Sequence, residues 1–335
     1  MPIVLDGTQG ISTPMYAGSI SSNAVTPVIG MKNKIINGAC VIDQRNAGAS
    51  VSNSAGANYY LDRWQVATAQ ASKMTIQQNA GSVTPPVGFS NYLGLTVTSA
   101  YTAGAADYYL FAQKIEGFNA SDLGFGTANA KTVTISFQVY SSLTGTFCAA
   151  LQNAAGNRTY IFNYTIFSAN TWTTITQTIT GDTSGTWGSG NSSWGELKFD
   201  LGSGSNYQTS TVGSWAATGA FTTASAVKFV ANASATFYIT GVQLEVGSTA
   251  TSFDYRPYGT ELALCQRYFQ RTANLYVPVL QGPITTNFAY PVTMRDTPTV
   301  GGNIAGYTPV VVNDYAASFY SSVSNSYIFT LSSEI

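Results

Sequence analysis

The chain has 335 residues, enough for more than one domain and for a sizeable core without metals or disulfides. Only 9% of its residues are charged, the formal net charge is −1 and no basic run occurs, so we expect no nucleic-acid partner. No stretch approaches the roughly 18 apolar residues that a membrane-spanning helix needs, so we expect no membrane insertion.

With so few charges, the solvated surface must be built largely from Ser, Thr, Asn, Gln and Gly. Such a surface suits a rigid extracellular β-protein and neutral glycan partners, which are recognised through hydrogen bonds and stacking. The opening residues, MPIVLDGTQGISTPMYAG, have neither the positive region nor the long apolar region of a secretory signal. We therefore expect assembly in the cytoplasm and release by lysis.

Residues 1–34 form a separate segment that is rich in Gly, Ser, Thr and Pro. Its apolar pairs, Ile3-Val4 and Val28-Ile29, favour burial against a partner over free solvation. We expect this segment to attach the protein to a larger particle or to wind around sister chains; a free tail is the alternative.

Short strands separated by turn residues follow from about residue 35. The clearest is 132–140, where Val133, Ile135, Phe137 and Val139 alternate with polar residues, as in a strand with one buried face. The same alternation recurs at 93–97, 160–166 and, more weakly, 175–179. Many short strands without a long helical period predict an antiparallel β-sandwich over residues 35–256. No repeat of 20–50 residues is visible, which argues against a β-helix.

The last strand of the sandwich is predicted at 236–246. Its apolar alternation shifts by one residue at Thr240-Gly241, which indicates a β-bulge. Residues 257–335 then form a short helix and a small C-terminal β-domain. Thr260 is the predicted N-cap of the helix, with Glu261 in the first turn. Leu262, Cys265 and Phe269 are expected on one helical face.

Two segments carry a family resemblance. KIINGACVIDQRNAGAS (34–50) and GVQLEVGSTATSFDYRPYGTELALCQRYF (241–269) resemble the opening and the closure of a module found in tailed-bacteriophage tail-fibre and related virion structural proteins. VLDGTQGISTP (4–14) and FAYPVTMRDTPTV (288–300) are similar to further segments of these proteins.

This resemblance implies a jelly-roll β-sandwich like that of carbohydrate-binding modules, located in the virion and assembled as a homotrimer. Residues 1–34 would bind other virion proteins, and the fibre would bind a host-surface glycan without making or breaking bonds. Two alternatives stay open. One is a head fibre, decoration or adaptor protein that binds only virion proteins, and the other is a glycan depolymerase.

The sequence contains no histidine, which excludes catalysis by Ser-His-Asp and Cys-His arrangements and His-ligated zinc. We expect no enzymatic activity and no cofactor. A glycosidase needs only two carboxylates, and the first candidates are Asp182, Glu196 and Asp200 beside a Trp-rich loop; solvated turn acids are the alternative.

The cysteines also lack the spacing that is typical of metal-binding or redox sites. Cys40, Cys148 and Cys265 match no metal or redox spacing and are expected to be buried. Jelly-roll carbohydrate-binding modules often hold a structural calcium ion, for which Asp43, Glu245 and Asp254 are available. An ion pair of one of these acids with Arg45 or Arg256 explains them equally well, and we predict no metal site.

Aromatic residues are the candidates for ligand binding. Trp187 and Trp194 lie at the two ends of a polar loop and, with Tyr207 and Trp215, could form a platform on which sugar rings stack. The alternative is that Trp194 and Trp215 begin strands and fill the core; Trp172 is also expected in the core. A rival site lies in the C-terminal β-domain, where Tyr307, Tyr315 and Tyr320 are expected on polar connections.

Overall fold

The computed structural model describes residues 4–6, 10–12, 31–272, 275–277, 286–302, 307–321 and 325–335. The chain divides into two compact units, Met1–Lys32 and Asn33–Ile335. In the first unit, β1 (Val4–Asp6) and β2 (Gly10–Ser12) pair as antiparallel strands. Most of the predicted attachment segment, 1–34, lies outside the described residues, so its role stays a prediction.

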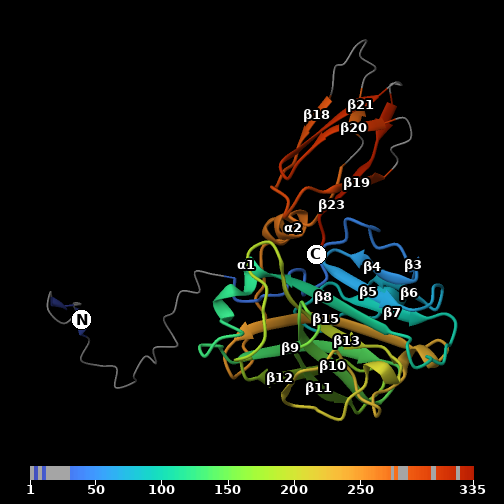
Figure 1. Cartoon of the computed structure of the whole chain (residues 1–335), viewed down its shortest axis with the longest axis vertical. Coiled ribbons are helices and arrows are strands. Elements are labelled where there is room, and N and C mark those ends of the chain that lie inside the picture. The colour runs from blue at the N-terminus through green and yellow to red at the C-terminus, as the bar shows by residue number, and fades with distance from the viewer. Residues whose placement is uncertain are drawn as a thin grey trace. The chain divides into compact units, whose positions relative to one another are not determined.

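Two antiparallel sheets form the body of the second unit (Figure 1). The seven-stranded sheet has the order β14 (Trp215–Ala216), β11 (Thr159–Ile166), β10 (Gly145–Asn153), β13 (Ser193–Asp200), β8 (Tyr109–Glu116), β5 (Trp64–Thr68), β4 (Gly56–Leu61). The six-stranded sheet has the order β12 (Thr173–Ile179), β9 (Val133–Ser141), β15 (Thr236–Val246), β7 (Leu93–Val97), β6 (Met74–Gln78), β3 (Val51–Ser52). From β7 to β10, and from β11 to β13, each successive strand lies in the other sheet. The prediction of an all-β jelly-roll sandwich is confirmed.

The predicted alternation accounts for the core between the sheets. In β9 the side chains of Val133, Ile135, Phe137 and Val139 are buried, while Ser136, Gln138 and Tyr140 on the opposite face are only partly buried. One large cluster of such inward side chains joins both sheets. The inward half of each strand therefore holds the sandwich together by excluding water from apolar surface.

The bulge predicted at Thr240-Gly241 is confirmed. The register of β15 against β9 shifts between Thr240 and Gln243, and Gly241 has φ of 62°. A Cβ atom at Gly241 would lie 2.6 Å from Cζ of Phe89. Glycine is required here both by the left-handed backbone and by the neighbouring ring.

Beyond the sandwich, α2 spans Tyr258–Gln266 and α1 is a single turn, Gly117–Ala120. The predicted start of α2 was wrong: its N-cap is Pro257, in an extended conformation, so Thr260 lies inside the first turn with Glu261. Phe269 was also placed wrongly, because the helix ends at Gln266 and Phe269 begins a strand.

The described part of the C-terminal region forms three small antiparallel sheets. Their strands are β16 (Phe269–Arg271) with β23 (Phe329–Ser332) and β19 (Thr299–Gly302), β17 (Leu275–Val277) with β22 (Asn325–Tyr327), and β18 (Thr286–Ala289) with β21 (Ala316–Ser321) and β20 (Tyr307–Val312). They have a small core of their own, which includes Met294, Ala317, Phe329 and Leu331. None of the helices in the described ranges is long and apolar enough to cross a membrane.

Candidate functional site

The outer face of the seven-stranded sheet is covered by the chain that runs from β13 to β15. The strands carry small side chains on this face, among them Ala112, Cys148 and Ala150. Phe221, from the covering segment, is 3% exposed and packs against this group. Because the strand residues are small, the segment lies close to the sheet.

Backbone hydrogen bonds hold the covering segment in place. Gly213 donates its N–H to the carbonyl of Ile161 on β11 at 2.8 Å. Val227 donates to the carbonyl of Thr146 on β10, also at 2.8 Å. These two bonds fix the segment to the sheet at both Gly213 and Val227, so that the segment can form one wall of a pocket.

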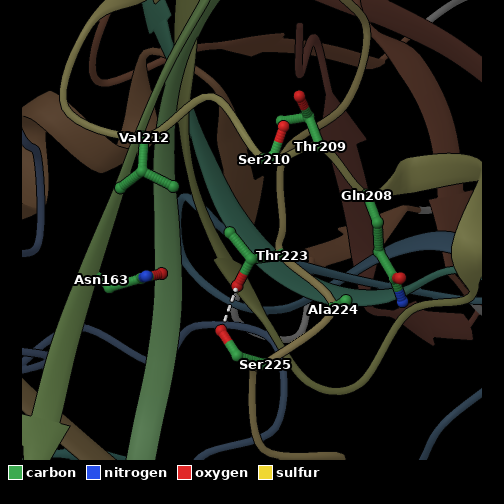
Figure 2. Close-up of a pocket in the computed structure, with 8 residues that line it drawn as sticks. All are labelled: Asn163, Gln208, Thr209, Ser210, Val212, Thr223, Ala224 and Ser225. Atoms are coloured by element: carbon green, nitrogen blue, oxygen red, sulfur yellow. Dashed lines mark hydrogen bonds between the residues drawn. The ribbon is translucent and has the colours of Figure 1, made fainter.

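A pocket of about 560 Å³ opens between β11 and this segment (Figure 2). It is lined by one residue of β11 and seven of the segment, namely Asn163, Gln208, Thr209, Ser210, Val212, Thr223, Ala224 and Ser225. Figure 2 shows Asn163 and Val212 on one side of the pocket and Gln208 on the other.

The lining carries hydrogen-bonding groups but no charge. Asn163 is exposed, and the hydroxyls of Thr223 and Ser225 lie 3.2 Å apart in a mutual hydrogen bond. Val212, 38% exposed, supplies an apolar surface beside them. Amides and hydroxyls can donate to and accept from a ligand that has many hydroxyl groups, and the apolar side chain can cover its C–H face.

The predicted tryptophans do come together, but at the end of the sandwich core. The rings of Trp187 and Trp194 lie 4.3 Å apart, and Trp187 and Trp215 meet edge to face at 5.5 Å. Phe125 packs against all three. Trp194 is 1% exposed and lies near the start of β13, as the alternative interpretation held. Only Trp187 and Trp215, both partly buried, retain surface for a ligand.

Tyr207 is not part of that cluster. Its ring packs against Phe221 and Tyr108, and its hydroxyl donates to the carbonyl of Ala106 at 3.2 Å. It thus supports the segment that carries Gln208. Trp172, expected in the core, instead packs against Tyr92 and Tyr140 on the outer face of the six-stranded sheet.

The tyrosines proposed for the C-terminal domain do not all lie on connections. Tyr307 begins β20 and Tyr320 lies in β21, and their side chains are outside the described part of the structure. Tyr315 lies in the turn between these strands and is 62% exposed. A ligand-binding role of these tyrosines stays a prediction.

The three candidate catalytic acids each have a partner in the protein. Asp182 is buried and is bound by Arg158 through two hydrogen bonds of 2.9 and 2.5 Å. Glu196 forms an ion pair with Lys198 at 2.9 Å. Asp200 accepts hydrogen bonds from Ser203 N and from the Thr222 hydroxyl, and burial raises the pKa of its carboxyl.

The candidate calcium ligands are also used by the protein. Asp43 accepts from the N–H groups of Asn46 and Gly48, and Glu245 from the N–H and hydroxyl of Thr251. Among the described residues, no three His, Cys, Asp or Glu side chains are grouped so as to hold a metal ion.

The alternative explanation for these acids, an ion pair of one of them with Arg45 or Arg256, is confirmed. Asp254 lies 3.7 Å from Nε of Arg256, as expected, whereas Arg45 pairs with Glu334 instead.

The three cysteines are free and buried, as predicted. Burial raises the pKa of the thiols of Cys40 and Cys148 to about 12. They would therefore stay protonated and unreactive at neutral pH.

Sequence reasoning missed the pocket because it followed aromatic residues. Asn163 lies on β11, far along the chain from the segment that faces it. One signal was available: residues 201–227 contain no charged side chain and are rich in Ser, Thr and Gly.

Comparisons with known proteins find no matching family model and no matching curated protein. Among solved structures, the chain is similar to the enzymatically active domain of tailspike protein 4 of bacteriophage CBA120, with 13% identity and a TM-score of 0.33 over 64% of this chain. It spans only 22% of that tailspike chain.

Two carbohydrate-binding modules are also similar. A CBM4 module matches at 19% identity and a TM-score of 0.31, over 63% of this chain and 98% of the module. The family 11 module from Clostridium thermocellum, in complex with a β-1,3-1,4-mixed-linked tetrasaccharide, matches at 13% identity and a TM-score of 0.30, over 59% of this chain and all of the module.

Proposed function

We propose that this protein is a bacteriophage tail fibre, a homotrimeric virion protein that attaches to the host surface by binding a glycan without catalysing a reaction. The observation that carries the glycan-binding part is the uncharged, hydroxyl- and amide-rich lining of the pocket around Asn163 and Gln208. The resemblance of residues 34–50 and 241–269 to phage virion modules supports the proposed tail-fibre role, virion location and trimeric assembly.

A neutral sugar ring matches this lining chemically. It offers many hydroxyl groups that donate and accept, and it has an apolar face. A site built from Asn, Gln, Thr and Ser can satisfy such hydroxyls, and leaving them unpaired on burial would be costly. Three linked sites in a trimer would raise a weak affinity by orders of magnitude through effective concentration.

Calorimetric titration with a panel of neutral oligosaccharides tests the binding site. We expect Asn163→Ala to weaken binding about fivefold, the value of one hydrogen bond. Thr174→Ala is the matched control, because Thr174 is exposed in β12 of the other sheet. If both variants bind like the unchanged protein, the pocket is not the glycan site.

Light scattering of the full chain and of a form starting at Met31 tests assembly. The truncation must spare Asn33, whose side-chain carbonyl accepts from the N–H groups of Ile35 and Leu244 at 2.9 and 3.0 Å. We expect the full chain to be a trimer and the shortened form to dissociate. A monomer in both forms, without affinity for sugars, would favour a decoration or adaptor protein that binds only virion proteins.

The absence of catalysis is tested by incubating the protein with each glycan that it binds and measuring new reducing ends. We expect none, because Asp182 and Glu196 are occupied by Arg158 and Lys198. Release of oligosaccharides that is lost in Asp182→Asn would instead identify a depolymerase.

A further inference from the structure

A second cavity adjoins the pocket that is lined by Asn163 and Gln208. It has a volume of about 290 Å³ and lies between the segment after β7, the glycine-rich turn after β13 and the turn that begins at Lys228. Gln208 lines both cavities. The two cavities therefore adjoin at this side chain.

Close packing of backbone shapes the second cavity. A Cβ atom at Gly204 would lie 1.9 Å from the carbonyl oxygen of Gly104, and one at Gly202 would lie 2.9 Å from Cα of Lys228. Two glycines thus bring the turn after β13 against both other walls. The cavity is a defined recess in the fold and not a gap between loose loops.

Lys228 is the one charged residue among those that line the two cavities. Its ammonium group donates one hydrogen bond, of 2.8 Å, to the carbonyl oxygen of Ser203. An ammonium group has three donors, so this bond positions the group and leaves donors for a ligand. In a chain with only 14 basic residues, a lysine here gives the second cavity a different chemistry from the first.

Two acids lie close to the second cavity, Asp200 beside Lys228 and Asp107 beside Gly204, and both are bound within the protein. Asp200 is 2% exposed and accepts from Ser203 N and the Thr222 hydroxyl. Burial raises the pKa of its carboxyl, against the opposing effects of these hydrogen bonds and of Lys228. Asp107 accepts from Gly104 N and from the Tyr101 hydroxyl, both at 2.8 Å.

We infer that Lys228 receives an anionic substituent of the glycan, so that the ligand is an acidic oligosaccharide. A neutral ring occupies the Asn163 cavity, and the sugar that carries a carboxylate or similar group occupies the Lys228 cavity. This inference rests on the proposed glycan-binding function, since it names the class of glycan for that site.

The test uses uronic-acid oligosaccharides from alginate, hyaluronan and polygalacturonate, each paired with its carboxyl-reduced form. Reduction removes the charge and keeps the backbone of the sugar. The full-length protein should bind the acidic form of the recognised glycan about tenfold tighter than the reduced form, as expected for a hydrogen bond to a charged group. The difference should shrink as salt is raised from about 20 to about 500 mM, because mobile ions screen it.

Three variants locate the effect. Lys228→Gln should reduce the ratio of the two affinities to about one, whereas Lys228→Arg should retain most of it. Ala231→Glu adds a negative charge to the same cavity without removing the bond between Lys228 and Ser203, and it should lower the ratio as well. Lys131→Gln is the matched control, since Lys131 is exposed and does not line either cavity.

The outcomes separate the two proposals. Equal binding of the acidic and reduced forms by the unchanged protein overturns the acidic-ligand inference and leaves the proposed glycan binding intact. A preference for the acidic form that survives in folded Lys228→Gln, checked by its melting curve, also overturns the inference. If neither form nor any neutral glycan binds, the proposed function itself fails.

Discussion

The carboxylate of Glu334 accepts a hydrogen bond of 2.8 Å from Nη2 of Arg45, although 289 positions separate the two residues. Arg63 pairs with the same carboxylate, and the Glu334 side chain is 7% exposed. Figure 1 shows the C-terminus beside α2, near β4 and β5. The last residues thus return to the sandwich and are held there by two guanidinium groups.

The segment 34–50, which resembles phage proteins, also contacts the residues that follow α2. Gln44 donates to the carbonyl of Phe269 at 3.0 Å and to the carboxylate of Asp62 at 2.7 Å. The guanidinium carbon of Arg45 lies 3.8 Å from the centre of the Phe269 ring. In the described structure, these residues connect the sandwich to the C-terminal sheets.

Glu334→Gln should lower the free energy of unfolding by about 3 kcal/mol, because it leaves the buried charge of Arg63 without its ion-pair partner and also removes the pair with the partly buried Arg45. Denaturant unfolding followed by circular dichroism measures this. Asp296→Asn is the control: Asp296 is 64% exposed and lies 3.9 Å from Arg295, so its loss should cost less than about 0.5 kcal/mol. Equal stability of the two variants would mean that the Glu334 pairs contribute nothing net.

Asp62 should make stability depend on pH. Burial raises the pKa of its carboxyl from 3.8 to about 6, against the opposing effect of Arg45 and of the Gln44 hydrogen bonds. The folded state therefore holds the proton more tightly than the unfolded state. The stabilisation that Asp62 contributes is complete below pH 3.8 and is lost as the pH rises to about 6.

The comparison of unchanged protein with Asp62→Asn measures this contribution. The stability of the variant relative to the unchanged protein should rise by roughly 2.5 kcal/mol between pH 3.8 and about pH 7, because the unfolded Asp62 is already half ionised at pH 3.8. Unfolding curves at several pH values provide the data. A difference that does not vary with pH would contradict the raised pKa.

Gly241→Ala should destabilise the sandwich by about 2 kcal/mol, through the left-handed backbone and the contact with the Phe89 ring. Gly259→Ala is the contrasting variant. Gly259 lies in α2, and a Cβ atom added there would have no other atom within 4 Å, so alanine should stabilise the helix by up to about 1 kcal/mol. Thermal melting of both variants measures these effects. A lower melting temperature for Gly259→Ala, or an unchanged one for Gly241→Ala, would contradict the prediction.

Trp194→Ala should cost about 4 kcal/mol, because it leaves a cavity in the core. Trp187→Ala should cost less, since that ring is only partly buried. The pair is compared by denaturant unfolding, and sugar binding is measured on both folded variants. If Trp187→Ala lowers sugar affinity without a large loss of stability, the stacking role predicted for Trp187 gains support.

Alternation in the sequence predicted some of the strands, at 93–97, 132–140, 160–166, 175–179 and 236–246, because alternation along one strand is a local property. Val133 to Val139 and the bulge at Gly241 needed no knowledge of distant residues. Local reasoning failed at α2: Thr260 is a good capping residue, but Pro257 already has the extended backbone from which the helix starts.

The composition of the chain determined, without the structure, that its surface carries few charges and that histidine chemistry is excluded. Only the tertiary structure decided which residues meet. It placed Trp194 in the core, set Asn163 opposite Thr223, brought Lys228 beside Gln208 and joined Glu334 to Arg45. Such contacts depend on the order of strands in two sheets and on the path of the segment that covers one of them. Periodicity specifies which face of a strand is buried, but it does not specify the partner across the sheet or above it.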